Sequence, residues 1–372
     1  MADPQRALRR ILLEPVDRIP HWEHLSNPDF LGLVAGVDPY EQPRTAALRT
    51  YEALPLDMGL GIPESDEPIP RPDDTSSSFT DELGRRSVRW GAERTWHWDW
   101  GRGFVTIEDV LAYDPLEHMD QTGEQVVATY DYRPSAEEMA EQFCGGPPPG
   151  PTAPRARTLK GAGFYNTLFM WPLLTFGWEL FLTLAGGYRE DCKRLLAGFA
   201  ERSRRYIKAW SLSDIDFFNT HDDICCAAGP VCSPAWLREM IYPYYEEFFG
   251  YLRGSGIKVL FTTDGNPDLV ADDLFAVGVD GLISEPFADW KAIARKHPDK
   301  VLAGEGDNRI LMRNDPAEIE AMVQSMCATG RDHAGYFMCV GNHIPWNVPA
   351  EAVKRYFDYS DKCGRLDGAA LP

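Results

Sequence analysis

In the second half of the chain, short runs of apolar and β-branched residues alternate with longer stretches whose apolar residues recur every three or four positions. This alternation is typical of a parallel sheet whose strands are joined by helices. Helical spacing follows each run, and most of these helical stretches end near a glycine or a proline. The runs that predict strands are residues 215–220, 257–263, 279–284, 300–306 and 335–341.

Three further runs, residues 18–25, 54–62 and 163–170, predict strands in the first half. Eight strands, most followed by helices, predict an α/β fold, a (β/α)8 TIM barrel formed by residues 1–372 as a single domain. Residues 63–130 show a strand-like alternation and predict a β-rich insertion, either a subdomain or a lid. A doubly wound sheet is the main alternative, but no glycine-rich phosphate fingerprint follows an early strand.

Functional residues of a barrel gather where its strands end. The stretch KVLFTTDGN (258–266) has this form, because a buried strand runs directly into Asp264. We expect catalytic groups among the ionisable residues at these ends, namely Asp264, His221, Asp223, Glu285 and His343. We expect substrate contacts from His21, Glu23, His24, Asn266, Tyr165 and Asn342.

Several of these residues have structural alternatives. Asp264 precedes Gly-Asn-Pro and could form a turn or cap a helix. One of Asp222 and Asp223 could cap the segment after its strand. His21 and His24 lie three apart, so at most one should face the pocket. The five candidate catalytic residues could hold zinc, iron or manganese, or could work without a metal if crowding raises the pKa of a carboxyl group.

Composition narrows the classes of partner. The formal charge of −20 argues against nucleic acid and anionic membranes. There is no run of about 18 apolar residues that could span a membrane. The eight cysteines form no CxxC pair, so we expect reduced thiols and a cytoplasmic location. A small-molecule substrate is the expected partner, and the sequence leaves a homodimer open.

Residues 222–266 resemble the central region of the uroporphyrinogen decarboxylase superfamily, which includes cobalamin-dependent methyltransferases. Supporting matches are VDRIP (16–20), GLISEP (281–286), LAGEGDNRIL (302–311) and GYFMCVGNHIPWNVPAEAV (335–353). The resemblance covers about 210–360 well and 10–62 loosely, and it leaves the insertion unmatched. It implies a (β/α)8 barrel with its pocket at the C-terminal mouth.

The chain departs from the two best-known branches. The decarboxylases carry an arginine-rich loop after strand one, whereas HWEHLSNPDF (21–30) contains no arginine. A substrate with eight carboxylates would be repelled there. The thiol-methylating branch holds zinc with a His-x-Cys pair and a later cysteine. The matching positions here are Thr262, Asp264 and Asn342, so we expect that zinc site to be missing.

The resemblance therefore favours a corrinoid-linked methyltransferase whose methyl donor is a small, non-thiol, ether- or amine-like molecule. Asp264 would assist the leaving group as an acid. The cobalamin would be supplied by a partner corrinoid protein, and a divalent metal stays open. The alternative is a metal-dependent or metal-free lyase, a decarboxylase of a small substrate other than uroporphyrinogen.

Overall fold

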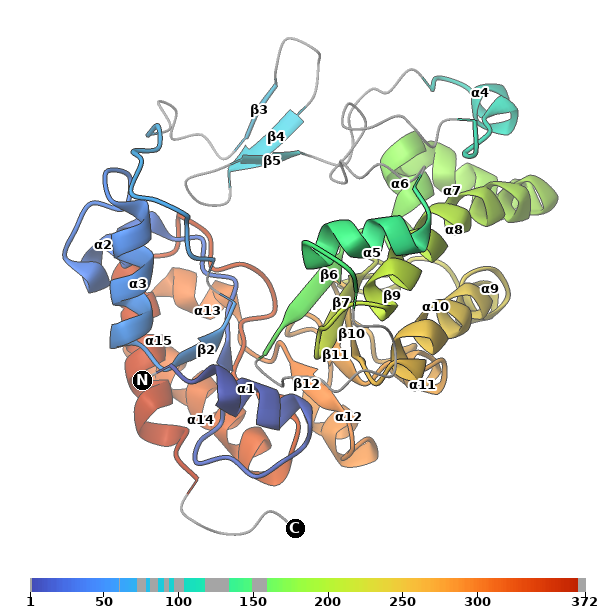
Figure 1. Ribbon diagram of the computed structural model, residues 1–372. Coiled ribbons are helices and arrows are strands. Elements are labelled where there is room, and N and C mark those ends of the chain that lie inside the picture. The colour runs from blue at the N-terminus through green and yellow to red at the C-terminus, as the bar shows by residue number, and fades with distance from the viewer. Residues whose placement is uncertain are drawn as a thin grey trace.

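Eight parallel strands form the centre of the protein in the computed structural model, which describes residues 2–59, 61–71, 78–80, 86–89, 94–96, 104–117, 134–148 and 159–366 (Figure 1). They are β1 (His21–Trp22), β2 (Leu56–Met58), β6 (Gly161–Phe164), β7 (Phe217–His221), β10 (Lys258–Thr262), β11 (Gly281–Ile283), β12 (Val301–Ala303) and β13 (Tyr336–Phe337). Each lies within or overlaps one of the runs predicted as strands, so that prediction is confirmed.

The strands follow one another around the barrel in chain order. Parallel ladders join β6, β7, β10, β11, β12 and β13 in that order, and another joins β1 to β2. A parallel bridge between His21 and Met338 places β1 next to β13. Within the described ranges no ladder pairs the two end strands, β2 and β6. The predicted (β/α)8 barrel is confirmed.

Helices surround the strands, and the two ends of the chain meet on one side. The N-terminal α2 packs against the C-terminal α15, and both lie at the left of Figure 1. The helices are α1 (Pro4–Ile11), α2 (Pro28–Ala35), α3 (Pro43–Ala53), α4 (Ile107–Ala112), α5 (Ala136–Cys144), α6 (Met170–Phe176), α7 (Trp178–Gly187), α8 (Arg189–Ser211), α9 (Pro234–Met240), α10 (Tyr242–Gly254), α11 (Ala271–Ala276), α12 (Trp290–Lys296), α13 (Asn308–Arg313), α14 (Pro316–Asp332) and α15 (Ala350–Cys363).

Strand residues alternate between two hydrophobic clusters, as the period of two requires. One set fills the barrel interior and includes Phe217, Leu260 and Phe337. Their neighbours Phe218 and Phe261 belong to the larger cluster between the strands and the surrounding helices. A side chain at a strand end therefore points into the barrel if it lies an even number of residues from an interior residue of that strand, and toward the helices if the number is odd.

The segment between β2 and β6 contains a three-stranded antiparallel sheet in the range predicted to be β-rich. Its strands are β3 (Ser78–Thr80), β4 (Arg86–Arg89) and β5 (Arg94–Trp96). Much of 63–130 lies outside the described residues, so its role as a lid stays a prediction.

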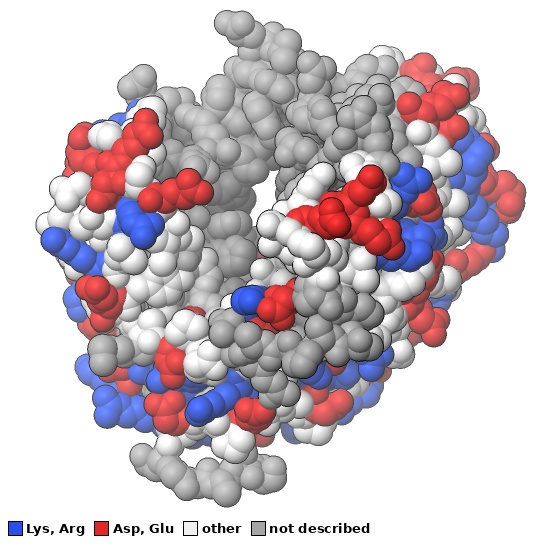
Figure 2. Space-filling view, in the orientation of Figure 1, with Lys and Arg blue, Asp and Glu red and all other residues white. Residues whose placement is uncertain are grey.

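Acidic side chains gather over α5, whose exposed residues include Glu137, Glu138 and Glu141 (Figure 2).

The cysteines differ in part from expectation. Cys327 of α14 and Cys363 of α15 form a disulfide, so the expectation of reduced thiols is wrong for these two residues. The tight packing of α14 against α15 brings them together, although they lie 36 residues apart in the sequence. In the part of the chain that the structure describes, no helix is long and apolar enough to cross a membrane.

Candidate active site

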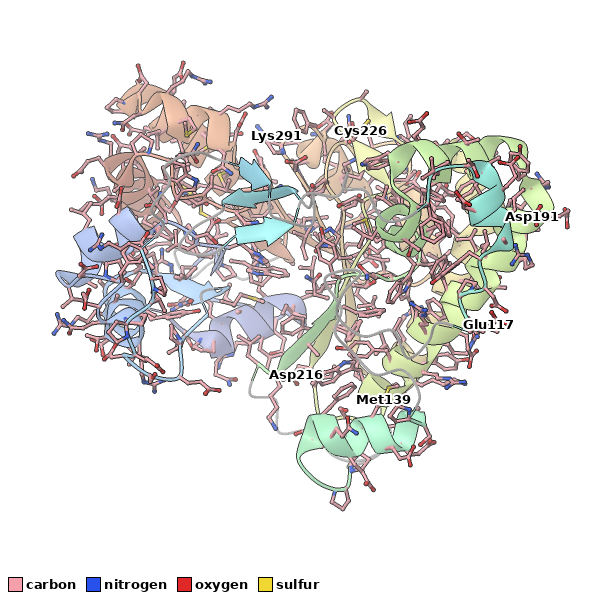
Figure 3. All side chains as sticks on the ribbon, turned by 90° about the horizontal axis from the view of Figure 1, so that it is seen from above. Glu117, Met139, Asp191, Asp216, Cys226 and Lys291 are labelled. Atoms are coloured by element: carbon pink, nitrogen blue, oxygen red, sulfur yellow. A yellow bond between two sulfur atoms is a disulfide. The ribbon has the colours of Figure 1, made fainter. Side chains whose placement is uncertain are left out.

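A cavity of about 450 Å³ lies at the C-terminal ends of the barrel strands. The direction of β7 can be followed in Figure 3, where Asp216 lies just before the strand and Cys226 lies beyond its far end. The cavity is lined by Trp22, His24, Gly163, Phe164, Tyr165, Asn219, His221, Thr262, Asp264, Ile283, Cys339, Val340, Gly341, Asn342 and His343. Six of the predicted site residues therefore meet here: His24, Tyr165, His221, Asp264, Asn342 and His343.

Asp264 is the acidic residue in this lining. The pKa of its carboxyl group is raised to about 7, first by burial and then by the nearby carboxylates of Asp223 and Glu285, while His221 opposes the rise. The next residue, Gly265, has φ +79°, and a Cβ there would lie 2.3 Å from the backbone of Cys226. A glycine at this position thus lets the chain turn tightly just after Asp264.

Asp223 joins the ends of two neighbouring strands. Its Oδ1 lies 2.9 Å from Nε2 of His221 and accepts the backbone N–H of Asp264 at 3.1 Å. Burial lowers the pKa of His221, but the carboxylates of Asp223 and Asp264 outweigh burial, so the pKa is raised overall. Asp223 therefore favours the imidazolium form of His221 beside the cavity.

Glu285 and Asn342 complete the surroundings of Asp264. Glu285 Oε2 accepts the backbone N–H of Gly265 at 2.7 Å, which ties the end of β11 to the turn after β10. The amide nitrogen of Asn342 lies 3.4 Å from Asp264 Oδ1 and 3.5 Å from Glu285 Oε1. Two predicted catalytic residues, Asp223 and Glu285, thus support the cavity from behind its lining.

Two neutral imidazoles form another part of the wall. The rings of His24 and His343 meet edge to face, with centroids 5.1 Å apart. Burial, together with the neighbouring His24 and His221, lowers the pKa of His343 to about 4. Burial and His221 also lower the pKa of His24. Both rings are therefore uncharged at neutral pH.

The structure does not bring His21, Glu23 or Asn266 into the cavity lining. His21 is fully buried against Tyr356 and Phe357, and it shares its side of the chain with Glu23, two residues on. Both carboxylate oxygens of Glu23 accept the backbone N–H of Val340. Trp22 and His24 have the opposite parity and face inward. Asn266 instead accepts the backbone N–H of Asp268 in a turn.

Asp222 has a structural role, unlike its neighbour. Its carboxylate accepts the backbone N–H groups of Leu168, Phe169 and Met170 at 2.6–2.9 Å, and the hydroxyl of Tyr245 at 2.5 Å. It is fully buried. Asp222 therefore anchors the start of α6, which follows strand three, instead of the segment after its own strand.

The described residues do not fit a metal site. Among them, no three His, Cys, Asp or Glu side chains are arranged to hold a metal ion. The positions matched to zinc ligands in the thiol-methylating branch carry a hydroxyl, a carboxyl and an amide, at Thr262, Asp264 and Asn342. This donor set lacks the thiolates and imidazoles typical of zinc sites.

Nine residues of the lining were not among the predicted site residues, and four of these are Trp22, Asn219, Thr262 and Cys339. Parity along the strands could have found two of them. Asn219 lies two residues before His221, and Thr262 lies two before Asp264, so each shares the inward face of its strand. These two also contact each other, since the Thr262 hydroxyl donates to Asn219 Oδ1 at 3.0 Å.

Replacing Asp223 by asparagine should lower the pKa of both His221 and Asp264. His221 would lose the carboxylate that offsets its burial, and Asp264 would lose a like charge that raises its pKa. NMR titration of the His221 imidazole and of the Asp264 carboxyl group, compared with the unchanged protein, measures both shifts. An unchanged or higher pKa of His221 would show that Asp223 does not control its charge.

Comparisons with known proteins agree with this architecture. The family model for uroporphyrinogen decarboxylase (URO-D) matches residues 175–363. A solved structure described as a methyltransferase from Methanosarcina mazei matches 97% of this chain and 99% of its own, with a TM-score of 0.61 and 15% sequence identity. At that identity the likeness concerns the fold. No curated protein matches the chain in sequence.

Proposed function

Because the chain belongs to the uroporphyrinogen decarboxylase (URO-D) family, we propose that it is a methyltransferase that moves a methyl group from a small, uncharged ether to a corrinoid carried by a partner protein. The observation that carries the proposal is Asp264, which lines a cavity together with His221 and keeps its proton up to near-neutral pH. An acid of this kind assists a leaving group that departs as an alkoxide or phenoxide.

The lining supports an uncharged donor. Its described residues include no Lys or Arg, and the positive charge of His221 is already paired with Asp223, so a carboxylate or phosphate on the donor would be buried without a counter-ion of its own. A quaternary ammonium donor releases a neutral amine, which needs no proton as it departs. An ether oxygen does need one, and this need favours an ether over an amine.

The size of the cavity supports a small donor and a separate carrier for the acceptor. About 450 Å³ lies in the range of small-molecule sites but is too small to enclose a whole corrinoid. When bound, the corrinoid supplies a reduced cobalt that takes the methyl group. The cavity lies at the C-terminal ends of the strands, so a carrier would approach from that end.

The chain's own residues would orient the donor and move one proton. Trp22, Phe164 and Ile283 offer apolar walls for the carbon part of the donor. As the methyl C–O bond breaks, its electron pair stays on oxygen and the proton of Asp264 moves to that oxygen. The product alcohol or phenol leaves, and Asp264 is left as a carboxylate near the positive charge of His221. Solvent then restores its proton.

A direct test mixes the protein with cobalamin reduced to the Co(I) state and single donors: methyl phenyl ether, 2-methoxyethanol or tetramethylammonium. We expect the absorbance change that accompanies methylation of cobalt, with release of phenol or of the diol, at least about tenfold faster for an ether than for tetramethylammonium. Product analysis by chromatography confirms which bond is cleaved.

The same assay separates the proposal from a lyase. Benzoic acids with and without ring hydroxyl groups serve as probes for CO2 release in the absence of cobalamin. Decarboxylation without a cobalamin requirement would overturn the methyltransferase proposal, as would faster reaction with tetramethylammonium than with either ether. Heat-inactivated protein controls for the slow reaction of free reduced cobalamin.

A further inference from the structure

The orientation of the Asn342 amide is determined by a backbone group. The N–H of His343 donates to Asn342 Oδ1 at 2.7 Å. A backbone N–H can only donate, so the atom that faces it must be the amide oxygen. The amide nitrogen then points the other way, toward the carboxylates of Asp264 and Glu285.

That orientation determines the proton position on the neighbouring ring. Nδ1 of His343 lies 3.2 Å from the same oxygen of Asn342. Since this oxygen can only accept, Nδ1 must carry the hydrogen. The ring is neutral because burial and the nearby His24 and His221 lower its pKa to about 4. A neutral ring protonated at Nδ1 has an unprotonated Nε2.

Hydrogen bonds to other segments hold the backbone around His343 in place. Asn308, the first residue of α13, donates its side-chain amide to the His343 carbonyl at 2.6 Å. The backbone N–H of Ile344 donates to the carbonyl of His24 at 2.9 Å, which ties this loop to the segment after β1. The N–H of His343 therefore keeps a constant direction, and the amide of Asn342 follows it.

We propose that Asn342 is a positioning residue that holds His343 as the neutral Nδ1–H tautomer, so that Nε2 is a hydrogen-bond acceptor and cannot give a proton to a leaving group. The second half of this statement rests on the proposed function: of the two groups, Asp264 is then the proton donor. The groups that face this pair are Asp264 and Glu285 at the amide nitrogen, and His24 and His221 around the ring.

The tautomer can be measured without substrate or corrinoid. Long-range ¹H–¹⁵N correlation spectra of histidine-labelled protein at pH 7.5 distinguish protonated from bare ring nitrogens, and His343→Gln identifies the signals of His343. We expect the Nδ1–H pattern in the unchanged protein. Asn342→Ala removes the acceptor and should convert most of the signal to the Nε2–H tautomer, which histidine prefers in water.

Two variants separate the tautomer effect from general damage. Asn342→Asp keeps an acceptor oxygen for Nδ1, so the Nδ1 proton should persist although the donor to Asp264 and Glu285 is lost. Asn347→Ala changes an exposed asparagine of the same loop and should leave the His343 signals unchanged. Unfolding curves show whether each variant keeps its fold.

The outcomes for the tautomer are independent of turnover. An Nε2–H pattern in the unchanged protein, or an Nδ1–H pattern that survives Asn342→Ala, would overturn the role of Asn342. In the ether assay, the fall in rate above pH 7 should keep its position in His343→Gln. Loss of that fall would make His343 the acid and overturn the second half of the proposal, while leaving the tautomer result to stand by itself.

Discussion

Replacing Asp264 by asparagine is expected to lower the rate of ether cleavage by at least about a hundredfold, because asparagine has nearly the same shape but no proton to give. In the unchanged protein the rate should fall as the pH rises through about 7, where Asp264 loses its proton. The residual rate of Asp264→Asn should lack that fall. Steady-state rates from pH 5.5 to 9 measure both effects.

The same variant should be more stable than the unchanged protein at pH 8. The pKa of Asp264 rises from its ordinary value of 3.8 to about 7 on folding, so the folded state holds this proton more tightly. Stability is therefore lost as the pH rises from about 4 through 7. Each unit of pKa shift corresponds to about 1.4 kcal/mol. Since Asp264 is only partly buried, we expect Asp264→Asn to gain on the order of 1–2 kcal/mol at pH 8.

Asp268→Asn is the matched control, because Asp268 is an exposed aspartate four residues further along the same loop. Its side-chain Oδ1 accepts the backbone N–H of Asp289, which an asparagine oxygen can still accept. It should change neither the rate nor the pH dependence of stability. Full activity of Asp264→Asn, or a melting temperature that falls with pH as in the unchanged protein, would contradict the assignment of Asp264 as the acid.

Replacing Asp222 by alanine should lower the free energy of unfolding by about 3–5 kcal/mol. Three backbone N–H groups at the start of α6 and the hydroxyl of Tyr245 would lose their acceptor inside the protein. Water cannot replace the carboxylate there, because the site is fully buried. Urea unfolding followed by circular dichroism measures the loss.

Smaller changes at the same site should cause smaller losses in the free energy of unfolding. Asp222→Asn keeps one acceptor oxygen and should lose less than Asp222→Ala. Tyr245→Phe removes a single donor and should cost about 1 kcal/mol. Asp223→Asn, one residue away, should shift pKa values at the cavity with a much smaller loss of stability. Equal stabilities of Asp222→Ala and the unchanged protein would show that the carboxylate does not anchor α6.

The candidate site was predictable from sequence where a strand led directly into it. His221 and Asp264 end strands whose apolar runs are visible in the sequence, and parallel strands bring their ends to one edge. The separate roles of Asp222 and Asp223 were not predictable in the same way. Both follow β7, but the groups that donate hydrogen bonds to Asp222 come from the segment after β6 and from α10. The role of Asp222 in anchoring the start of α6 therefore depends on the packing of these segments, which the sequence does not show.

Glu23 and the disulfide also have partners that are distant in the sequence and could not be predicted from it. The side chain of Glu23 follows a short strand, as catalytic residues do, yet its parity turns it toward the backbone of Val340, more than 300 residues away. Cys327 and Cys363 have no telling spacing and meet only because α14 packs on α15.

Local periodicity acts over a few residues, so the sequence by itself determined the number of strands, the chain order of the barrel and six of the residues at its mouth. The direction, partner and proton of each group depend on neighbours that are distant along the chain. These features, the amide of Asn342 and the pKa of Asp264 among them, were decided only when the tertiary structure brought the strand ends together and removed water between them.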